Sequence, residues 1–138
     1  MTSLTLKAHG NIADIGRDAW DACANPAKVA PDCGIPFDPF TSYAFLSALE
    51  ESESACARTG WAPYHLELVS EEEGTLAVMP MYLKNHSQGE YVFDYAWADA
   101  FERAGGNYYP KLQVSVPFTP ATGRRLLTRQ HGDTEELE

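Results

Sequence analysis

The stretch "TLAVMPMYLK", residues 75–84, decides the fold of this chain. It is apolar on both faces, which is typical of a strand that is covered on both sides of a sheet. Pro80 interrupts the stretch, and proline has no backbone N–H to donate to a neighbouring strand. The pattern therefore predicts a strand with an edge or a bulge at Pro80. A bulge in a central strand opens a sheet, and such an opening suits a ligand.

Other segments around this stretch also have strand patterns. Residues 64–69 alternate between an apolar face and a face that carries His65 and Glu67. The turn "SEEEG" follows them. We expect three more strands, in residues 4–10, 90–94 and 108–118, the last with a single row formed by Leu112, Val114, Val116 and Phe118.

Three segments have helical patterns. Residues 11–26 place apolar side chains at helical spacing, and Asn11 is a suitable cap. Residues 38–57 begin with Asp38 or a following hydroxyl as cap. Residues 95–106 end at paired glycines. In the second helix we expect a buried stripe and a water-facing set of acids; the stripe is Phe45, Leu46 and Leu49, and the acids are Glu50, Glu51 and Glu53.

The order of these elements predicts an α/β domain with a mixed or antiparallel sheet and helices on its faces. The length of 138 residues suits one domain, and 44% hydrophobic residues can form a core. No apolar run is long enough for a membrane span, and the N-terminus lacks the pattern of a signal peptide. We therefore expect a cytoplasmic protein. The chain has three cysteines, an odd number, and no two of them form a C-x-x-C pair. We therefore expect neither a disulfide scaffold nor a metal site.

The net charge of −10 disfavours general nucleic-acid binding, which needs Lys and Arg against phosphates. The charge is uneven along the chain. Residues 1–83 hold four Lys and Arg against twelve Asp and Glu, whereas residues 84–131 hold six against four. The second half suits an anionic ligand, although scattered, solvated charges explain the same counts.

The segment "KNHSQGEYVFDYAW", residues 84–97, concentrates groups that can do chemistry. His86 and Glu90 lie four apart around a turn, so they are candidates for a base and the carboxylate that orients it. Turn residues often have this composition for conformational reasons alone. Asp94 is a candidate ligand for substrate, and it also suits the cap of the next helix.

Aromatic and basic residues near this segment are the remaining candidates. Tyr91, Tyr108 and Tyr109 suit the wall of a cleft, although aromatic side chains more often form core. Lys111 follows them and is able to pair with a carboxylate or a phosphate. In "TGRRLL", Arg124 and Arg125 suit a phosphate through bidentate contacts, or they simply begin a solvated helix.

The strings "PFTSYAFLSALEESES", "TGWAPYHLELV" and "PMYLKNHSQGEYVFDYAWADAFERAGGNYYPKLQVSVPFTPATGRRLL" together resemble the bacterial FemAB-like family. That family is described as peptidoglycan-biosynthesis proteins within the acyl-CoA N-acyltransferase (GNAT-like) superfamily. The resemblance runs from about residue 12 to residue 127. It implies a GNAT-like fold with a mixed, largely antiparallel sheet, flanked by helices and splayed at its centre.

The resemblance also implies an activity. The donor would be acyl-CoA or an aminoacyl-tRNA, and the acceptor a small amine or a cell-wall precursor. Such a transfer needs a group that takes the proton of the amine and donors for the oxyanion. His86 and Glu90 are then the catalytic candidates. The substrate-binding candidates are Tyr91, Asp94, Tyr108, Tyr109 and Lys111, and the cofactor-binding candidates are Arg124 and Arg125.

Two departures from the family pattern limit this interpretation. Family members resemble a tandem of two such domains, so residues 1–131 would be a truncated N-terminal domain whose partner is a missing C-terminal GNAT-like domain. Residues 132–138 would be a polar tail that is partly vector-derived. The chain also lacks a Gly-rich pyrophosphate loop. We therefore expect this piece alone to be inactive and to bind no cofactor.

Two alternatives stay open. The chain is either part of a transferase or a non-catalytic domain that binds substrate or serves as a scaffold. Hydrolysis by His86 and Glu90 ranks last, because no nucleophile is identifiable. A truncated domain would also expose apolar surface, which predicts self-association.

Overall fold

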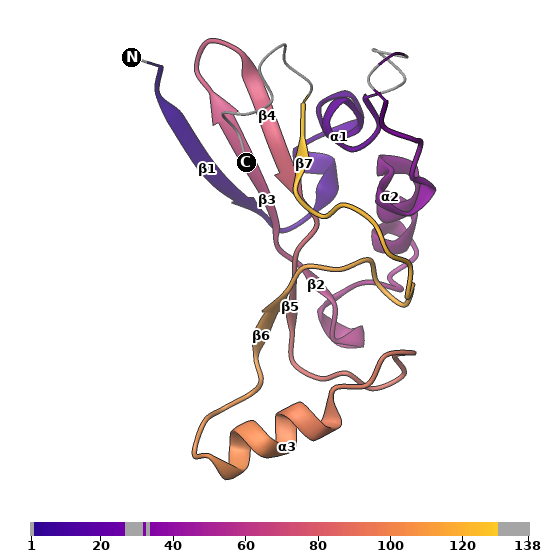
Figure 1. The fold of residues 1–138 in the computed structure, drawn as a ribbon, viewed down its shortest axis with the longest axis vertical. Helices are drawn as coiled ribbons and strands as arrows, with labels where there is room; N and C mark the ends of the chain where they lie inside the picture. Colours follow the sequence, from indigo (N-terminus) through magenta and orange to yellow (C-terminus); the bar gives the residue numbers. More distant parts are fainter. Residues whose placement is uncertain (1, 27–31, 33, 130–138) are drawn as a thin grey trace.

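The strand interrupted at Pro80 divides the structure into two sheets (Figure 1). The structure is a computed structural model, and it describes residues 2–26, 32 and 34–129. Its strands are β1 (Leu4–His9), β2 (Ala62–Pro63), β3 (His65–Ser70), β4 (Gly74–Met79), β5 (Tyr82–Lys84), β6 (Lys111–Gln113) and β7 (Leu127–Thr128). Its α-helices are α1 (Arg17–Ala24), α2 (Tyr43–Glu51) and α3 (Tyr95–Arg103).

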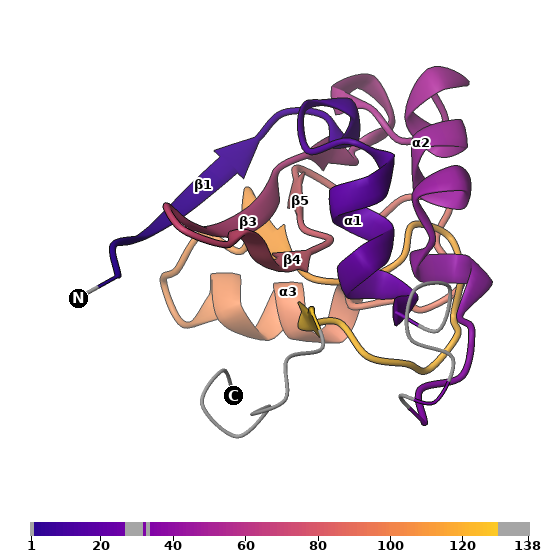
Figure 2. The ribbon, with the colours of Figure 1, turned by 90° about the horizontal axis from the view of Figure 1, so that it is seen from above.

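Every strand pair in the two sheets is antiparallel. The first sheet has the order β1-β3-β4-β7 and the second the order β2-β5-β6. Helices α1 and α2 lie on one side of the first sheet, and α3 lies beyond the second sheet (Figures 1 and 2). The expected α/β class is confirmed, and the arrangement fits the largely antiparallel, GNAT-like sheet with flanking helices.

The interruption at Pro80 is confirmed, because β4 ends at Met79 and β5 begins at Tyr82. Two hydrogen bonds hold the chain between them. The backbone N–H of Tyr64 donates to the carbonyl of Met81 at 2.8 Å. The N–H of Met81 donates to Nδ1 of His65 at 3.3 Å, so a side chain takes the place of a strand partner.

His65 is completely buried, and both of its ring nitrogens are engaged. Since Nδ1 accepts the N–H of Met81, the ring proton lies on Nε2, which donates to Oε2 of Glu50 at 2.8 Å. The other oxygen of Glu50 accepts the N–H of Ile12 at 2.8 Å. One carboxylate therefore ties α2 to β3 and to the turn before α1.

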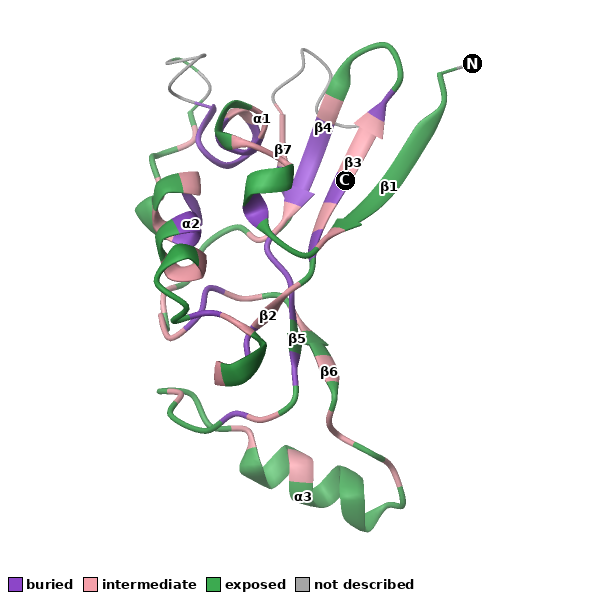
Figure 3. Ribbon diagram, turned by 180° about the vertical axis from the view of Figure 1, so that it is seen from behind, coloured by how far each residue is buried: buried purple, intermediate pink, exposed green. Residues whose placement is uncertain are grey.

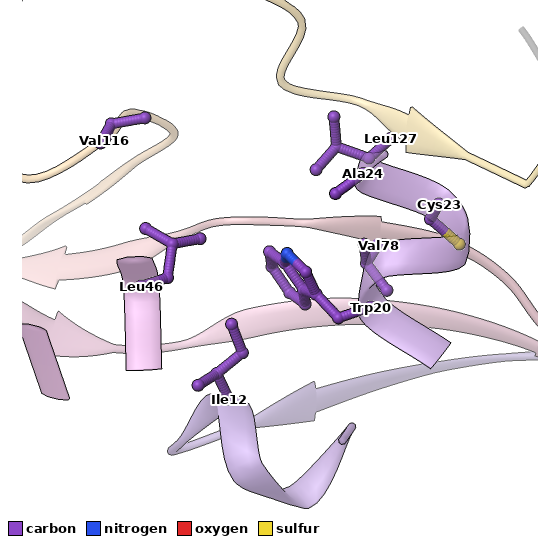
Figure 4. Packing of buried hydrophobic residues seen from close by; sticks show 8 residues of the cluster. All are labelled: Ile12, Trp20, Cys23, Ala24, Leu46, Val78, Val116 and Leu127. Atoms are coloured by element: carbon purple, nitrogen blue, oxygen red, sulfur yellow. The ribbon is translucent and has the colours of Figure 1, made fainter. Parts of the chain in front are cut away.

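The main core lies between α1, α2 and the first sheet. Trp20 is fully buried, and its ring lies among the side chains of Ile12, Leu46 and Val78 (Figure 4). Its indole N–H donates to the carbonyl of Thr41 at 2.8 Å. A smaller second cluster beside the second sheet contains Ala55, Trp61 and Tyr82.

The expected helix over residues 11–26 is shorter than predicted. Asn11 caps a single 3-10 turn, Ile12–Asp14, by accepting the N–H of Asp14 at 2.9 Å. The chain then bends at Gly16, whose φ of +90° suits glycine, and α1 begins at Arg17. The Asn11 cap is confirmed, and the continuous helix is wrong.

The expected helix over residues 38–57 is also split. Asp38 caps a 3-10 turn, Pro39–Thr41, and Ser42 caps α2 by accepting the N–H of Phe45 at 3.2 Å. The prediction that Glu50 faces water is wrong, because Glu50 is bonded to His65 and to Ile12. A carboxylate at this position gives the buried imidazole its partner, which helical spacing does not reveal.

Two strand predictions are wrong. Residues 90–94 form no strand, since Glu90 and Asp94 turn toward Lys84 and Lys111 instead of pairing along a ladder. The strand expected over residues 108–118 is reduced to β6. The chain leaves the sheet after Gln113; beyond it, Pro117 lacks a backbone donor and Phe118 has a φ of +57°, so the end of the predicted strand is not extended.

The alternation of residues 64–69 is confirmed, with the polar set turned inward. Glu67 is buried, and it accepts hydrogen bonds from His9 at 2.8 Å and from Thr75 at 2.6 Å.

The helix expected over residues 95–106 is confirmed as α3, which ends before Gly105. None of the described helices is long and apolar enough to cross a membrane. The predicted polar tail, residues 132–138, lies outside the described residues.

We predict that His65→Ala destabilises the fold by about 2–4 kcal/mol, because it leaves Oε2 of the partly buried Glu50 carboxylate and the buried Met81 N–H without their partner. Urea denaturation of the two proteins measures this difference in the free energy of unfolding. His86→Ala is the matched control, since His86 is partly exposed and its Nδ1 accepts only the N–H of Gln88, at 3.2 Å. Equal loss in both variants would contradict the role given to His65.

Candidate functional site

A pocket of about 370 Å³ opens beside the second sheet, where four segments of the chain meet. The segments are the end of the 3-10 turn before β2, the loop before α3, strand β6 with the residues around it, and the loop before β7. The lining residues are Trp61, Glu90, Tyr91, Val92, Asp94, Tyr108, Lys111, Gln113, Ser115, Val116, Phe118, Thr119, Pro120, Ala121 and Arg125. This volume lies within the range of small-molecule sites.

Asp94 is the centre of a hydrogen-bonded cluster on one wall of the pocket. Its Oδ2 accepts the hydroxyl of Tyr108 at 2.8 Å, and its Oδ1 accepts the hydroxyl of Tyr109 at 3.1 Å. Lys111 forms an ion pair with the same carboxylate and donates to the Tyr108 hydroxyl at 3.1 Å. Since the Tyr109 proton is engaged with Asp94, the hydroxyl of Ser87 donates to Tyr109 at 2.5 Å.

The pKa values of this cluster follow from these contacts. Burial alone would raise the pKa of Asp94, but hydrogen bonds from Lys111 and Tyr108 outweigh burial and hold this pKa at about 2. Burial alone would lower the pKa of Lys111, and the same contacts raise it. Burial raises the pKa of Tyr109. Asp94 and Lys111 are therefore both charged at neutral pH, and Asp94 is a poor general base.

The structure does not use Asp94 as a side-chain cap of α3. Asp94 occupies the N-cap position, but its carboxylate makes no capping hydrogen bond. The alternative, a role in the wall of a site, agrees with the contacts to Tyr108, Tyr109 and Lys111. A cap residue that turns its side chain away from the helix leaves the first-turn N–H groups to water or to other partners.

Glu90 faces a second lysine at the inner end of the pocket. Its carboxylate forms an ion pair with Lys84, whose side chain is 1% exposed. The Lys84 ammonium lies 3.6 Å from the centre of the Trp61 ring, which is a cation–π contact. Burial lowers the pKa of Lys84, and Glu90 opposes part of that effect. The indole N–H of Trp61 is buried and has no hydrogen-bond acceptor among the described residues.

The two arginines have different surroundings. Arg124 is exposed and donates to the carbonyl of Ala24 at 3.1 Å, near the end of α1. Arg125 lines the pocket and donates to the backbone carbonyls of Ala121 at 2.7 Å and of Arg124 at 3.2 Å. No carboxylate of the described residues forms an ion pair with Arg125. Its guanidinium is held by the backbone, and it retains its charge for a ligand.

The pocket brings together six of the nine residues that the sequence suggests for the site. These are Glu90, Tyr91, Asp94, Tyr108, Lys111 and Arg125. Tyr109 lies behind this wall and contacts it through Asp94. Arg124 lies outside the pocket.

His86 is not part of the pocket lining, and the proposed His86–Glu90 arrangement is not formed. Its ring lies against Gly60, where an added Cβ would come within 2.7 Å of Cε1. The carboxylate of Glu90 meets Lys84 instead. Gly60 has a φ of +83°, so the close approach of His86 and the backbone conformation both favour glycine there.

Sequence reasoning missed Lys84, Ser87 and Trp61. Lys84 ends the apolar stretch that crosses Pro80, and it lies directly opposite Lys111 in the pairing of β5 with β6. A lysine on a strand that is otherwise buried on both faces is a signal that could have found it. Nothing in the spacing of Trp61 relative to residues 84–90 predicts their contact.

The fold and the pocket define a small α/β domain with a ligand-sized site that is rich in aromatic rings and paired charges. A family model described as FemAB-like, peptidoglycan biosynthesis/recognition, matches residues 11–138, so this chain belongs to the FemAB-like family. Comparisons with curated proteins and with solved structures found no match.

We predict that Asp94→Asn lowers the free energy of unfolding by roughly 2 kcal/mol at neutral pH. The folded-state pKa of about 2 lies below the ordinary value of 3.8, so ionised Asp94 stabilises the fold at higher pH. This stabilisation is lost as the pH falls from about 4 to about 2. Urea denaturation of both proteins at several pH values measures this, and the two free energies of unfolding should become equal at low pH.

The matched control is Asp99→Asn, since Asp99 pairs with Arg103 on the exposed surface of α3. An exposed pair contributes at most about 1 kcal/mol. A difference between wild type and Asp94→Asn that stays constant down to low pH would contradict the proposed cluster.

Proposed function

We propose that this chain contributes the acceptor-binding pocket of an acyl- or aminoacyl-transferase that modifies cell-wall precursors. Family membership supports the connection to peptidoglycan. The observation that carries the proposal is that the carboxylates on the pocket walls are held in place by ion pairs. Glu90 is held by Lys84 and Asp94 by Lys111, which suits recognition of a charged ligand.

The pocket suits a ligand that carries both an amine and an acid. An ammonium group would lie near Glu90 and the ring of Tyr91, where a carboxylate and a ring quadrupole both attract it. A carboxylate or phosphate would lie near Arg125. Peptide portions of cell-wall precursors have this combination of groups.

The transfer itself would place further demands on the site. The acceptor amine must lose a proton before it attacks the carbonyl carbon of the donor, and the new C–N bond forms as the thioester or ester bond breaks. Glu90 is the best candidate for receiving that proton, because it lines the pocket and Asp94 is too acidic. The donor would be acyl-CoA or aminoacyl-tRNA, and from the family resemblance we propose a second GNAT-like domain as the partner.

The alternative is that the chain only binds or positions a substrate. The engagement of Glu90 with Lys84 and the position of His86 outside the pocket support this version. Both versions require the same pocket to bind the acceptor. They differ in whether Glu90 receives a proton during turnover.

We predict that calorimetric titration with a cell-wall stem peptide bearing a free side-chain amine gives saturable heat. Glu90→Gln should weaken this binding at least tenfold, about 1.4 kcal/mol, because the ligand ammonium loses its counter-charge. Glu102→Gln on the exposed end of α3 is the matched control and should bind as wild type. If the stem peptide produces no heat, the pocket is not the acceptor site proposed here.

Turnover, measured with the proposed second GNAT-like domain present, separates the two versions. In the transferase version, Glu90→Gln lowers kcat by about 10²–10⁴-fold, the usual contribution of a positioned acid or base. His86→Ala leaves kcat unchanged, since its ring lies against Gly60 and outside the pocket. A Glu90→Gln protein whose KM rises while kcat stays constant supports the binding version.

A further inference from the structure

Phe118 has a backbone conformation that favours glycine. Among the described residues, two that are not glycine have a positive φ, Glu53 at +58° and Phe118 at +57°. Glu53 directly follows Ser52, the C-cap of α2, where this conformation is common, and the chain is exposed where it leaves α2 (Figure 3). Phe118 follows no described helix, and a bulky side chain in this conformation is strained. Its conformation therefore needs a separate explanation.

A tight turn produces the positive φ of Phe118. The N–H of Thr119 donates to the carbonyl of Val116 at 3.4 Å, so the turn spans residues 116–119, with Pro117 second and Phe118 third. Proline suits the second position of such a turn, and a positive φ at the third position ordinarily belongs to glycine or asparagine. Glycine would serve the backbone better. The phenylalanine ring must therefore contribute enough elsewhere to offset its conformational cost.

The ring of Phe118 lies between the second core cluster and the pocket. It packs against Trp61, with ring centroids 5.4 Å apart, and both residues line the pocket. Phe118 is only partly buried. The Trp61 indole also contacts Lys84, whose ammonium lies 3.6 Å from the ring centre and pairs with Glu90. Phe118 is therefore connected, through Trp61, to the charged end of the pocket.

We propose that Phe118 is a specificity-determining residue, whose ring keeps ring-sized groups out of the pocket and admits slender, unbranched amines. The pocket volume of about 370 Å³ is near the lower end of small-molecule sites, so the space taken by one aromatic ring decides what fits. The turn holds the ring in place, because Pro117 fixes its own φ and the Thr119 N–H closes the turn. The preference for amines rests on the proposed function, whereas the size limit does not.

Phe118→Gly should enlarge the pocket and preserve the turn, because glycine adopts a φ of +57° freely. A cavity left by a deleted apolar side chain can bind an apolar molecule of matching size. Toluene is a neutral probe of that space, and benzylamine and n-pentylamine add an ammonium for Glu90. We expect Phe118→Gly to bind toluene and benzylamine at least about tenfold more tightly than wild type does, with little change for n-pentylamine.

The indole N–H signals in heteronuclear NMR spectra measure this binding. The chain has three tryptophans, Trp20, Trp61 and Trp97, and of these Trp61 lines the pocket. The Trp61 signal should shift with each bound probe. The signals of Trp20, which is buried in the main core, and of Trp97, which is exposed on α3, should stay in place.

Phe40→Ala is the matched control, because the Phe40 ring packs against Phe45 and is not part of the pocket lining. It should bind the three probes as wild type does. Equal binding of toluene and benzylamine by wild type and Phe118→Gly overturns the inference, even if both proteins bind n-pentylamine as the proposed function requires. Tighter binding of toluene by Phe118→Gly without binding of either amine supports the size limit and contradicts the proposed amine site.

Stability measurements keep the inference testable if loss of the ring weakens the fold. In urea, Phe118→Gly should unfold at a higher concentration than Phe118→Ala, because alanine retains the strained φ and glycine does not. The reverse order would contradict the conformation described for this turn. Phe118→Leu keeps an apolar contact with Trp61 and replaces Phe118→Gly if that variant does not fold. The same order of probe affinities is expected, and affinities equal to those of wild type overturn the inference.

Discussion

The hydrogen bond from the Met81 N–H to the ring of His65 is the contact on which the arrangement of the two sheets depends. Pro80 has no N–H of its own, and the next residue would leave a buried donor unpaired if no acceptor replaced the missing strand. His65 supplies that acceptor because Glu50 fixes its tautomer from the opposite side. The unpaired donor at the break would otherwise lower the stability of the fold, and the His65 ring holds the chain there in one conformation. The polypeptide enters β4 in one sheet and leaves as β5 in another.

The pocket is a consequence of this break. Because β5 belongs to the second sheet, Lys84 turns inward against Trp61, and its neighbour across the ladder is Lys111. Two lysines that lie directly opposite each other on neighbouring strands repel each other unless each has a counter-ion. Glu90 and Asp94 supply the counter-ions, which draws the loop before α3 toward the sheet and closes one wall of the pocket. The loop is therefore ordered by ion pairs and not by strand pairing.

Local chemistry explains which parts could be predicted from the sequence. The caps at Asn11, Asp38 and Ser42, the interruption at Pro80 and the end of α3 all depend on residues close together in the chain, and the structure has each of them. Helical spacing assigns Glu50 to solvent, because its partner His65 lies fifteen positions away. Proximity in sequence pairs Glu90 with His86, whereas its partner in the structure is the buried Lys84. Long-range pairing of charges leaves no periodic signal, so spacing alone misplaces such residues.

The paired charges also bear on what the pocket can do. A carboxylate whose pKa is held at about 2 gives up almost all of its basicity, so Asp94 contributes a fixed field and not a proton acceptor. Glu90 differs, since its partner Lys84 is buried and burial lowers the pKa of that ammonium. The Lys84–Glu90 pair therefore balances the burial of the ammonium against its attraction to the carboxylate. A charged ligand that approaches Glu90 would change this balance, because a second cation competes with Lys84 for the same carboxylate. Binding of a cation near Glu90 is therefore coupled to the Lys84–Glu90 ion pair.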